Sequence, residues 1–288
     1  MFEPAHLQAL AAILRTGSFE AAAAALNVTP SAVSQRIRGL EERLGTAVVV
    51  RADPCRPTTA GARLARHAEE VALLERTLAT DLGQAEGRAQ VRIAVNADSL
   101  ATWFLPALAT VPGLLFDLVI DDQDHSADLL RRGEVQAAVT AHGAPLAGCD
   151  AHPLGRLAYV ATASPAFVAR WFPDGVTAEA LAAAPALTFN RKDRLQADWA
   201  RDIAGRTVSL PTHLVASSHA FVEAARLGIG WGMNPLPLIR GEIAAGKLVA
   251  LADRTLDLAL HWQVTRLAGR ALAPLTASVR RAAAAALA

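Results

Sequence analysis

Apolar positions near the start of the chain recur with the period of a helix. Leu7, Leu10 and Leu14 stand three and four residues apart, and the pair Thr16-Gly17 that follows is suited to a helix end. Ser18 is a good N-cap for a second, shorter helix. The apolar face of that second helix comprises Phe19, Ala22, Ala23 and Leu26. The pattern therefore predicts two short helices in the first 26 residues.

Thr29 followed by Pro30 marks the start of a third helix, because proline at the first helical position loses no hydrogen bond. An apolar stripe follows one side of this helix: Val33, Ile37, Leu40 and Leu44. Hydrogen-bonding side chains occupy the opposite side: Ser31, Ser34, Gln35 and Arg38. This combination is the geometry of a helix-turn-helix whose last helix reads the major groove of DNA. The alternative is an ordinary surface helix, which usually carries more Glu and Lys.

Residues 47–51, with Pro54 and Pro57 after them, predict a short strand and a wing. Arginines flank this region and are either contacts to the DNA backbone or solvated charges. The distribution of charge favours the first interpretation, because residues 1–66 hold eight arginines against five acidic residues, although the whole chain has a net charge of only +1. The candidate DNA-binding residues are Ser18, Thr29, Ser31, Ser34, Gln35, Arg36, Arg38, Arg51 and Arg56.

A long amphipathic helix is predicted from Thr59 onward, where the sequence has few helix breakers. Its apolar seam is Leu64, Val71, Leu74, Leu78 and Leu82, at steps of seven, three and four. So narrow a seam favours pairing with a second copy, which would present two recognition helices to an approximately palindromic site. The alternative is that the seam covers the body of its own chain. Gly83 and Gly87 then predict a hinge.

Strand and helix patterns alternate through the rest of the chain. Predicted strands cover residues 91–95, 116–120, 135–140, 157–162, 186–190, 212–216 and 231–234, and predicted helices run through Leu108 and over 126–132 and 218–226. The alternation implies a parallel α/β sheet in two lobes with a cleft. Ligands of such sheets bind where strands end and helices begin, so Ser99, just after the first strand, is a candidate contact for a carboxylate.

Composition and motifs exclude several classes of protein. With 288 residues, 52% of them hydrophobic and 19% charged, the chain is globular and long enough for a small module and a larger domain. Its start resembles neither a signal peptide nor a membrane span, which predicts a cytoplasmic protein and argues against a secreted solute-binding protein. Cys55 and Cys149 lack metal-site spacing. Without a recognisable catalytic or cofactor motif, we expect neither an enzyme nor a cofactor.

The segment SFEAAAAALNVTPSAVSQRIRGLEERLGTAVVVR and the later PTTAG resemble the LysR-type transcriptional regulators, and the resemblance extends over the whole chain. Within that family, VNADSLATWFLPAL, LRRGEVQAAV and SSHAFVEAARLG are similar to the ArgP/LysG group, which senses lysine or arginine and controls basic amino-acid export. The resemblance implies a double-stranded DNA partner, homodimers that pair into tetramers, and an effector that alters DNA bending or contact with RNA polymerase.

The resemblance also implies an α+β and α/β fold in three parts. A winged helix-turn-helix occupies residues 1–58, a dimerising linker helix and hinge 59–87, and a two-lobed, periplasmic-binding-protein-like effector domain 88–288. One lobe covers about 91–160 plus 266–288, and the other covers about 161–265.

A basic amino acid needs a grip for its carboxylate, acceptors for its α-ammonium and an acidic partner for its cationic tip. We expect Ser99 and the backbone amides near Leu100 to hold the carboxylate, and Asp98 or Asp122 to meet a positive group. The remaining candidates are Ser217 and Ser218, closing from the other lobe, and Trp103, which either walls the cleft or lies in the core. Asp122 could equally belong to a solvated loop with Asp121 and Asp124. A different small carboxylate is the alternative effector.

Overall fold

The computed structural model describes residues 2–83, 88–120 and 126–287. The chain divides into two compact units, residues 1–91 with 113–117 and residues 92–112 with 118–288. Three helices open the first unit, as the apolar periodicity predicts: α1 (Pro4–Thr16), α2 (Phe19–Ala25) and α3 (Pro30–Leu44). Ser18 and Thr29 cap α2 and α3 by accepting hydrogen bonds from the backbone N–H groups of Ala21 and Ala32. Both predicted N-caps are therefore confirmed.

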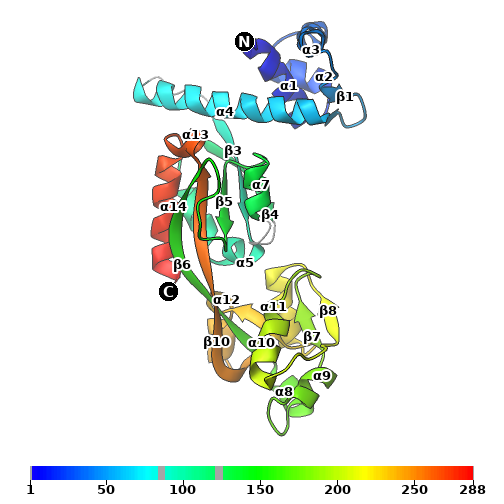
Figure 1. The fold of residues 1–288 in the computed structure, drawn as a ribbon, viewed down its shortest axis with the longest axis vertical. Coiled ribbons are helices and arrows are strands. Elements are labelled where there is room, and N and C mark those ends of the chain that lie inside the picture. The colour runs from blue at the N-terminus through cyan, green and yellow to red at the C-terminus, as the bar shows by residue number, and fades with distance from the viewer. Residues whose placement is uncertain (1, 84–87, 121–125, 288) are drawn as a thin grey trace. The chain divides into compact units, whose positions relative to one another are not determined.

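The apolar stripes of these helices bury one another in a single core, which Figure 1 shows as a cluster of short helices in blue. After these helices in the chain, β1 (Val49–Val50) pairs antiparallel with β2 (Arg56–Pro57), which confirms the predicted wing. The linker helix α4 (Thr59–Asp81) follows, with Thr58 as its N-cap. Gly61 in its first turn lies so close to the wing that a Cβ there would come within 1.8 Å of the Val48 carbonyl oxygen. Only glycine permits this approach.

The seam of α4 changes character along the helix. Leu64 is buried in the core of the first unit, whereas Leu74, Leu78 and Leu82 are 40%, 60% and 63% exposed. The second half of the seam is thus an apolar stripe that the described part of the chain leaves largely uncovered. Gly83 follows the helix with a φ of +68°, and the predicted hinge residue Gly87 lies outside the described residues.

A six-stranded sheet runs in the order β4-β3-β5-β10-β6-β9. The prediction of a parallel sheet is right for the pairing of β3 with β5 but wrong for the sheet as a whole, because β10 pairs antiparallel with both β5 and β6, and β6 pairs antiparallel with β9. The strands are β3 (Ala89–Val95), β4 (Leu114–Ile120), β5 (Ala137–Thr140), β6 (Cys149–Ala163), β9 (Gly232–Pro235) and β10 (Val249–Thr265).

Two lobes share β6 and β10, which run side by side from one lobe into the other (Figure 1). The first lobe is built on β3, β4 and β5 and carries the helical segments α5 (Ala97–Ser99), η1 (Leu100–Phe104), α6 (Leu105–Ala109), α7 (Ser126–Arg131), α13 (Arg266–Gly269) and α14 (Ala273–Ala286). The second lobe adds a parallel pair of strands, β7 (Ala186–Thr188) and β8 (Thr212–Leu214). Its helices are α8 (Pro165–Trp171), α9 (Ala178–Ala183), α10 (Leu195–Ala204), α11 (Ser218–Arg226) and α12 (Leu236–Ala244).

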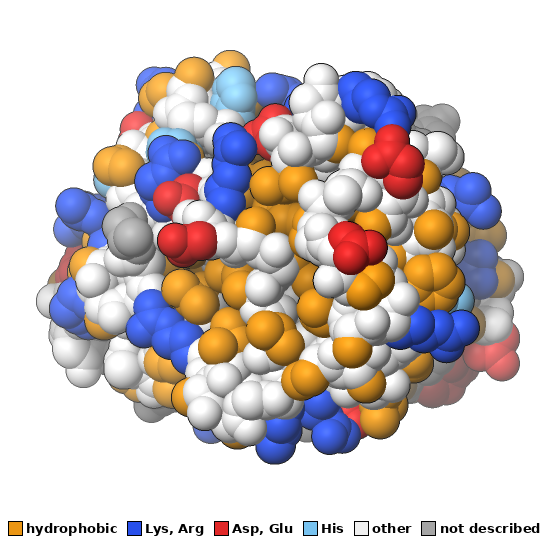
Figure 2. Space-filling model, turned by 90° about the horizontal axis from the view of Figure 1, so that it is seen from below, with side chains coloured by type: hydrophobic (Ala, Val, Ile, Leu, Met, Phe, Trp, Pro, Cys, Tyr) orange, Lys and Arg blue, Asp and Glu red, His pale blue; other side chains and the backbone are white. Residues whose placement is uncertain are grey.

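The surface mixes apolar and charged side chains. Figure 2 shows a face on which basic and acidic groups are interspersed among apolar ones, so this face has no extended field of one sign. None of the helices in residues 2–83, 88–120 and 126–287 combines the length and the apolar character needed to cross a lipid bilayer.

Candidate DNA-binding face and effector cavity

Helix α3 presents its hydrogen-bonding side away from the core. Ser31, Gln35 and Arg38 are exposed, and Ser34 and Arg36 are half-buried. On the opposite side, the apolar stripe of Val33, Ile37 and Leu40 is almost fully buried. A helix held by its apolar underside with an exposed Ser/Gln/Arg face is able to enter a major groove and donate hydrogen bonds to base edges.

The wing places further cations in the same unit. Arg51 and Arg56 are exposed, and the Arg51 guanidinium carbon lies 5.0 Å from the centre of the Phe19 ring on α2. This cation–π contact restrains Arg51 while its N–H edges stay available for a phosphate. Ser18 and Thr29 use their side-chain oxygens as helix caps, so they fix where α2 and α3 begin.

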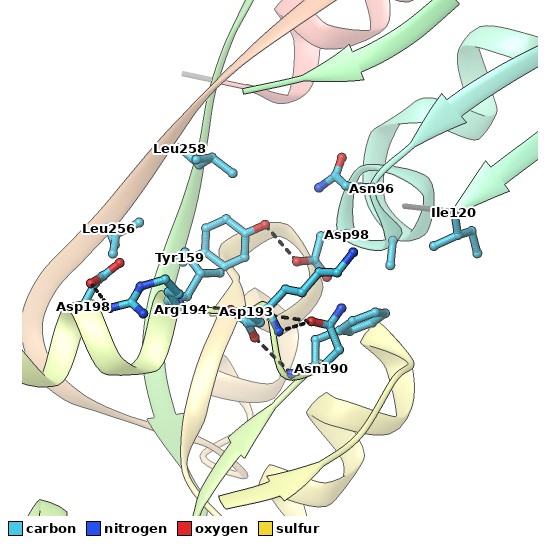
Figure 3. Close-up of a pocket in the computed structure, with 14 residues that line it drawn as sticks. Asn96, Asp98, Ile120, Tyr159, Asn190, Asp193, Arg194, Asp198, Leu256 and Leu258 are labelled. Atoms are coloured by element: carbon cyan, nitrogen blue, oxygen red, sulfur yellow. Dashed lines mark hydrogen bonds and ion pairs between the residues drawn. The ribbon is translucent and has the colours of Figure 1, made fainter. Parts of the chain in front are cut away.

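The second unit contains a cavity of about 360 Å³ that receives residues from both lobes (Figure 3). The first lobe contributes the start of the helix that follows β3, and the second contributes the segment from the end of β7 into α10. The lining residues are Asn96, Ala97, Asp98, Ile120, Tyr159, Phe189, Asn190, Lys192, Asp193, Arg194, Leu195, Asp198, Leu256 and Leu258.

Asp98 receives two hydrogen bonds from hydroxyl groups at this cavity. The Tyr159 hydroxyl on β6 donates to Asp98 Oδ2 at 2.8 Å, and the Ser218 hydroxyl at the start of α11 donates to Oδ1 at 2.6 Å. Burial raises the pKa of the Asp98 carboxyl above its usual value near 3.8; the two hydroxyls oppose this rise, and the charge of Asp193 adds to it. A cation placed here would favour the ionised carboxylate.

A tight turn from Asn190 to Leu195 forms another part of the wall. Asn190 Oδ1 accepts hydrogen bonds from the backbone N–H groups of Lys192 at 2.7 Å and Asp193 at 3.1 Å. The Asp193 carboxylate accepts from the backbone N–H groups of Phe189 and Leu195, each at 3.0 Å. Side chains that cap their own backbone in this way fix the turn that leads into α10.

Asp198 supplies a carboxylate on the other side of the cavity. Figure 3 shows Asp98 and Asp198 apart from each other, with Tyr159 between them and Leu258 above. Asp198 forms ion pairs with Arg201 at 3.1 Å and Arg194 at 3.9 Å. The cavity therefore combines carboxylates at separate points, an apolar middle and neighbouring basic side chains.

The predicted effector residues have different positions in the structure. Asp98 lines the cavity, and the Ser218 hydroxyl donates a hydrogen bond to its carboxylate. Ser217 is exposed and caps α11 by accepting a hydrogen bond from the Ala220 N–H. Asp122 lies outside the described residues.

Ser99 and Leu100, the residues expected to hold a carboxylate after β3, are not among the residues that line this cavity. Ser99 is fully buried, and the Leu100 N–H already donates to the Asn96 carbonyl oxygen within the helix. Trp103 is 3% exposed and packs edge-on against Phe104. It therefore lies in the core, which is the second of the two positions expected for it. Asp98 lines the cavity whereas Ser99 does not, because consecutive residues of a helix project in different directions.

Sequence reasoning missed Tyr159 and the segment from Asn190 to Asp198. Two signals were present: Tyr159 is the only tyrosine of the chain and stands in an apolar strand run, and Asn190 and Asp193 have the spacing of a self-capped turn. Neither signal reveals that the two segments meet, because that depends on the pairing of distant strands.

Family comparison identifies the class of protein. Residues 4–62 match the family model described as bacterial regulatory helix-turn-helix protein, lysR family, and residues 84–288 match the LysR substrate binding domain. The chain therefore belongs to the LysR family of DNA-binding transcription regulators, as its sequence resemblance predicts.

Individual relatives refine this placement. The chain is 47% identical over 280 residues to the HTH-type transcriptional regulator LysG of Mycobacterium tuberculosis, an alignment that covers 96% of this chain and 92% of that protein. A crystal structure of ArgP from Mycobacterium tuberculosis matches with a TM-score of 0.83 and 46% identity over 100% of this chain and 99% of that one. A full-length LysG from Corynebacterium glutamicum with bound effector Arg matches with a TM-score of 0.69 and 38% identity over 99% of each chain.

Proposed function

We propose that this regulator senses a basic amino acid, lysine or arginine, in the cavity between β6 and α10. The observation that carries the proposal is the presence of Asp98 and Asp198 on separate sides of a cavity of about 360 Å³. A basic amino acid carries two cationic groups joined by an apolar stem, and a cavity of this volume is in the range of small-molecule sites. The arginine bound to the similar Corynebacterium LysG supports this ligand class.

Each part of the ligand has a counterpart in the wall. We assign the cationic groups to Asp98 and Asp198, and the methylene stem to Leu256 and Leu258. Lys192 and Arg194 replace Ser99 and Leu100 as the partners of the α-carboxylate, because they line the cavity. Ser218 and Tyr159 position Asp98 through the hydrogen bonds described above.

The DNA-binding face completes the regulator. We infer that Ser31, Ser34, Gln35 and Arg38 contact bases, while Arg36, Arg51 and Arg56 contact phosphates. The exposed half of the α4 seam would join two copies, and two dimers would form a tetramer. The proposed domain boundaries match these roles: residues 1–58 bind DNA, residues 59–87 form the dimerising linker and hinge, and residues 88–288 bind the effector. A basic amino-acid exporter gene is the proposed target, RNA polymerase the proposed further partner, and the cytoplasm the proposed location.

Gel-shift titrations on the region upstream of the protein's own gene, with and without lysine or arginine, test the proposal. We expect salt-dependent binding whose affinity or pattern changes with the amino acid, and calorimetry should show binding of lysine, arginine or both. Asp98→Asn should weaken the binding of lysine and arginine without abolishing the binding of DNA in the gel.

The rival effector is a different small carboxylate, which Lys192 and Arg194 would also suit. Binding of such an acid together with no heat of binding from lysine or arginine would reject the basic amino-acid proposal and leave the DNA-binding role standing.

A further inference from the structure

A second, much smaller cavity opens beside Asp98. Its volume is about 20 Å³, enough for one atom of the size of a water molecule. Asp98 and Asp193 line both this side cavity and the effector cavity. The other polar lining residues are Ser218 and Asn234, and the rest of the wall is mostly apolar. The side cavity is therefore a compact extension of the effector site that is rich in hydrogen-bond acceptors.

Asn234, on β9, is fully buried and its amide has a defined orientation. Its Nδ2 donates to the Thr162 hydroxyl at 2.9 Å and to the Gly232 carbonyl oxygen at 3.3 Å. Because a carbonyl oxygen only accepts, the NH₂ group must face Gly232, and Oδ1 is left as the acceptor. Within the described part of the chain Oδ1 has no hydrogen-bond partner. A buried acceptor left unpaired is costly, and this one belongs to a residue that lines the side cavity, which indicates a partner that binds there from outside the chain.

We propose that this side cavity receives the α-ammonium group of the bound amino acid, with Asn234 Oδ1, Asp98 and Asp193 as its acceptors. The inference rests on the basic amino-acid proposal made above and adds the position of one functional group. An ammonium group has three N–H donors and no acceptor, so it matches a wall that offers three acceptors.

Size decides which cationic group enters. A guanidinium is a planar group of four heavy atoms and does not fit a space of about 20 Å³, whereas an ammonium has a single heavy atom. The compact cation that lysine and arginine share is the α-ammonium, so one side cavity serves both ligands. The side-chain cation, an ammonium in lysine and a guanidinium in arginine, then lies on the Asp198 side of the larger cavity. Asn234 becomes a specificity-determining residue for α-amino acids.

The test compares arginine with 5-guanidinopentanoate, which keeps the guanidinium and the carboxylate but lacks the α-amino group. Calorimetry on the full-length wild-type protein should show arginine binding about 100-fold more tightly or better, because sites built for a polar group reject ligands that lack it. In Asn234→Leu, arginine should weaken roughly 10-fold or more while 5-guanidinopentanoate changes little, so the ratio of the two affinities falls.

A matched control is Gln196→Leu. Gln196 is also a buried amide whose side-chain atoms have no partner among residues 2–83, 88–120 and 126–287, but it lines neither cavity at Asp98. Its substitution should leave the ratio of affinities unchanged. Asn234→Ser offers a milder second variant, with thermal melting and DNA binding as folding controls. If both variants unfold, the wild-type comparison can still overturn the inference.

Equal affinity of the wild type for the two ligands, as expected if water fills the side cavity, overturns the inference. So does an Asn234→Leu variant that binds both ligands with the same loss. In either case wild-type arginine binding would keep the proposed function intact, whereas absence of both lysine and arginine binding would reject the proposed function itself.

Discussion

The Ser218 hydroxyl lies 2.6 Å from Asp98 Oδ1, although the two residues are 120 positions apart in the chain. Asp98 belongs to the helical segment after β3 in one lobe, and Ser218 begins α11 in the other. The Asp98 carboxylate, which lines the proposed effector cavity, is therefore held from both lobes. A ligand that bound this carboxylate would act on both lobes at once, and its binding could therefore change how the two lobes are arranged.

Removing this link should weaken effector binding. We expect Ser218→Ala to reduce arginine affinity about three- to tenfold, because Asp98 loses a hydrogen bond that stabilises its ionised form. Calorimetry measures the change, and His219→Ala, an exposed neighbour on the same helix, is the control. Unchanged affinity in Ser218→Ala would show that the hydroxyl does not position the carboxylate.

Arginine affinity should depend on pH through Asp98. The pKa of this carboxyl is raised, and the cation binds the ionised form, so affinity should fall as the pH is lowered through the raised pKa. Binding should also release protons, which calorimetry in buffers of different ionisation enthalpy detects. Asp98→Asn should bind weakly with a flat profile, and a wild-type profile identical to that of the variant would contradict this role.

The same raised pKa predicts the sign of a stability change in the ligand-free protein. The folded chain holds the Asp98 proton more tightly than the unfolded chain, so the contribution of this group to stability is complete below the usual pKa near 3.8 and is lost as the pH rises through the folded value. Chemical denaturation at several pH values should show a smaller loss over that window in Asp98→Asn.

The wing arginine that contacts Phe19 should act through DNA phosphates. Arg51→Ala is expected to weaken binding to operator and unrelated DNA alike, and to lower the slope of log affinity against log salt by about one. Arg254→Ala removes an exposed charge in the other unit and is the control. A loss confined to operator DNA would instead assign Arg51 to base recognition.

The apolar stripe at the end of α4 should hold two copies together. Leu78 is 60% exposed in the single chain, and Leu78→Asp would place a charge in the proposed interface. Sedimentation at micromolar concentration should show a shift from dimers or tetramers toward monomers, with weaker operator binding. Glu75→Gln on the same helix should leave the assembly unchanged. A wild type that is monomeric would contradict the dimer proposal directly.

Local chemistry explains why the first unit follows the sequence so closely. The caps at Ser18 and Thr29, the helix end at Gly17 and the buried stripe of α3 all depend on residues within a few positions of one another. The strand β10 was missed for the opposite reason. Its first half, around Asp253 and Arg254, is polar and exposed, so it lacks the apolar run that marks a buried strand, and its antiparallel pairing with β6 supplies the order instead.

The amino-acid sequence alone determined the helix-turn-helix, the linker helix and the family, because periodicity, capping and motif spacing are properties of short segments. Only the tertiary structure decided which side chains meet at the effector cavity. Tyr159 donates to Asp98, and Asn190 and Asn234 line cavities that Asp98 also lines. They come together because β6 pairs with β9, and the strand before the Asn190 turn lies beside β9. Such contacts join residues far apart in the chain, and no local pattern encodes them.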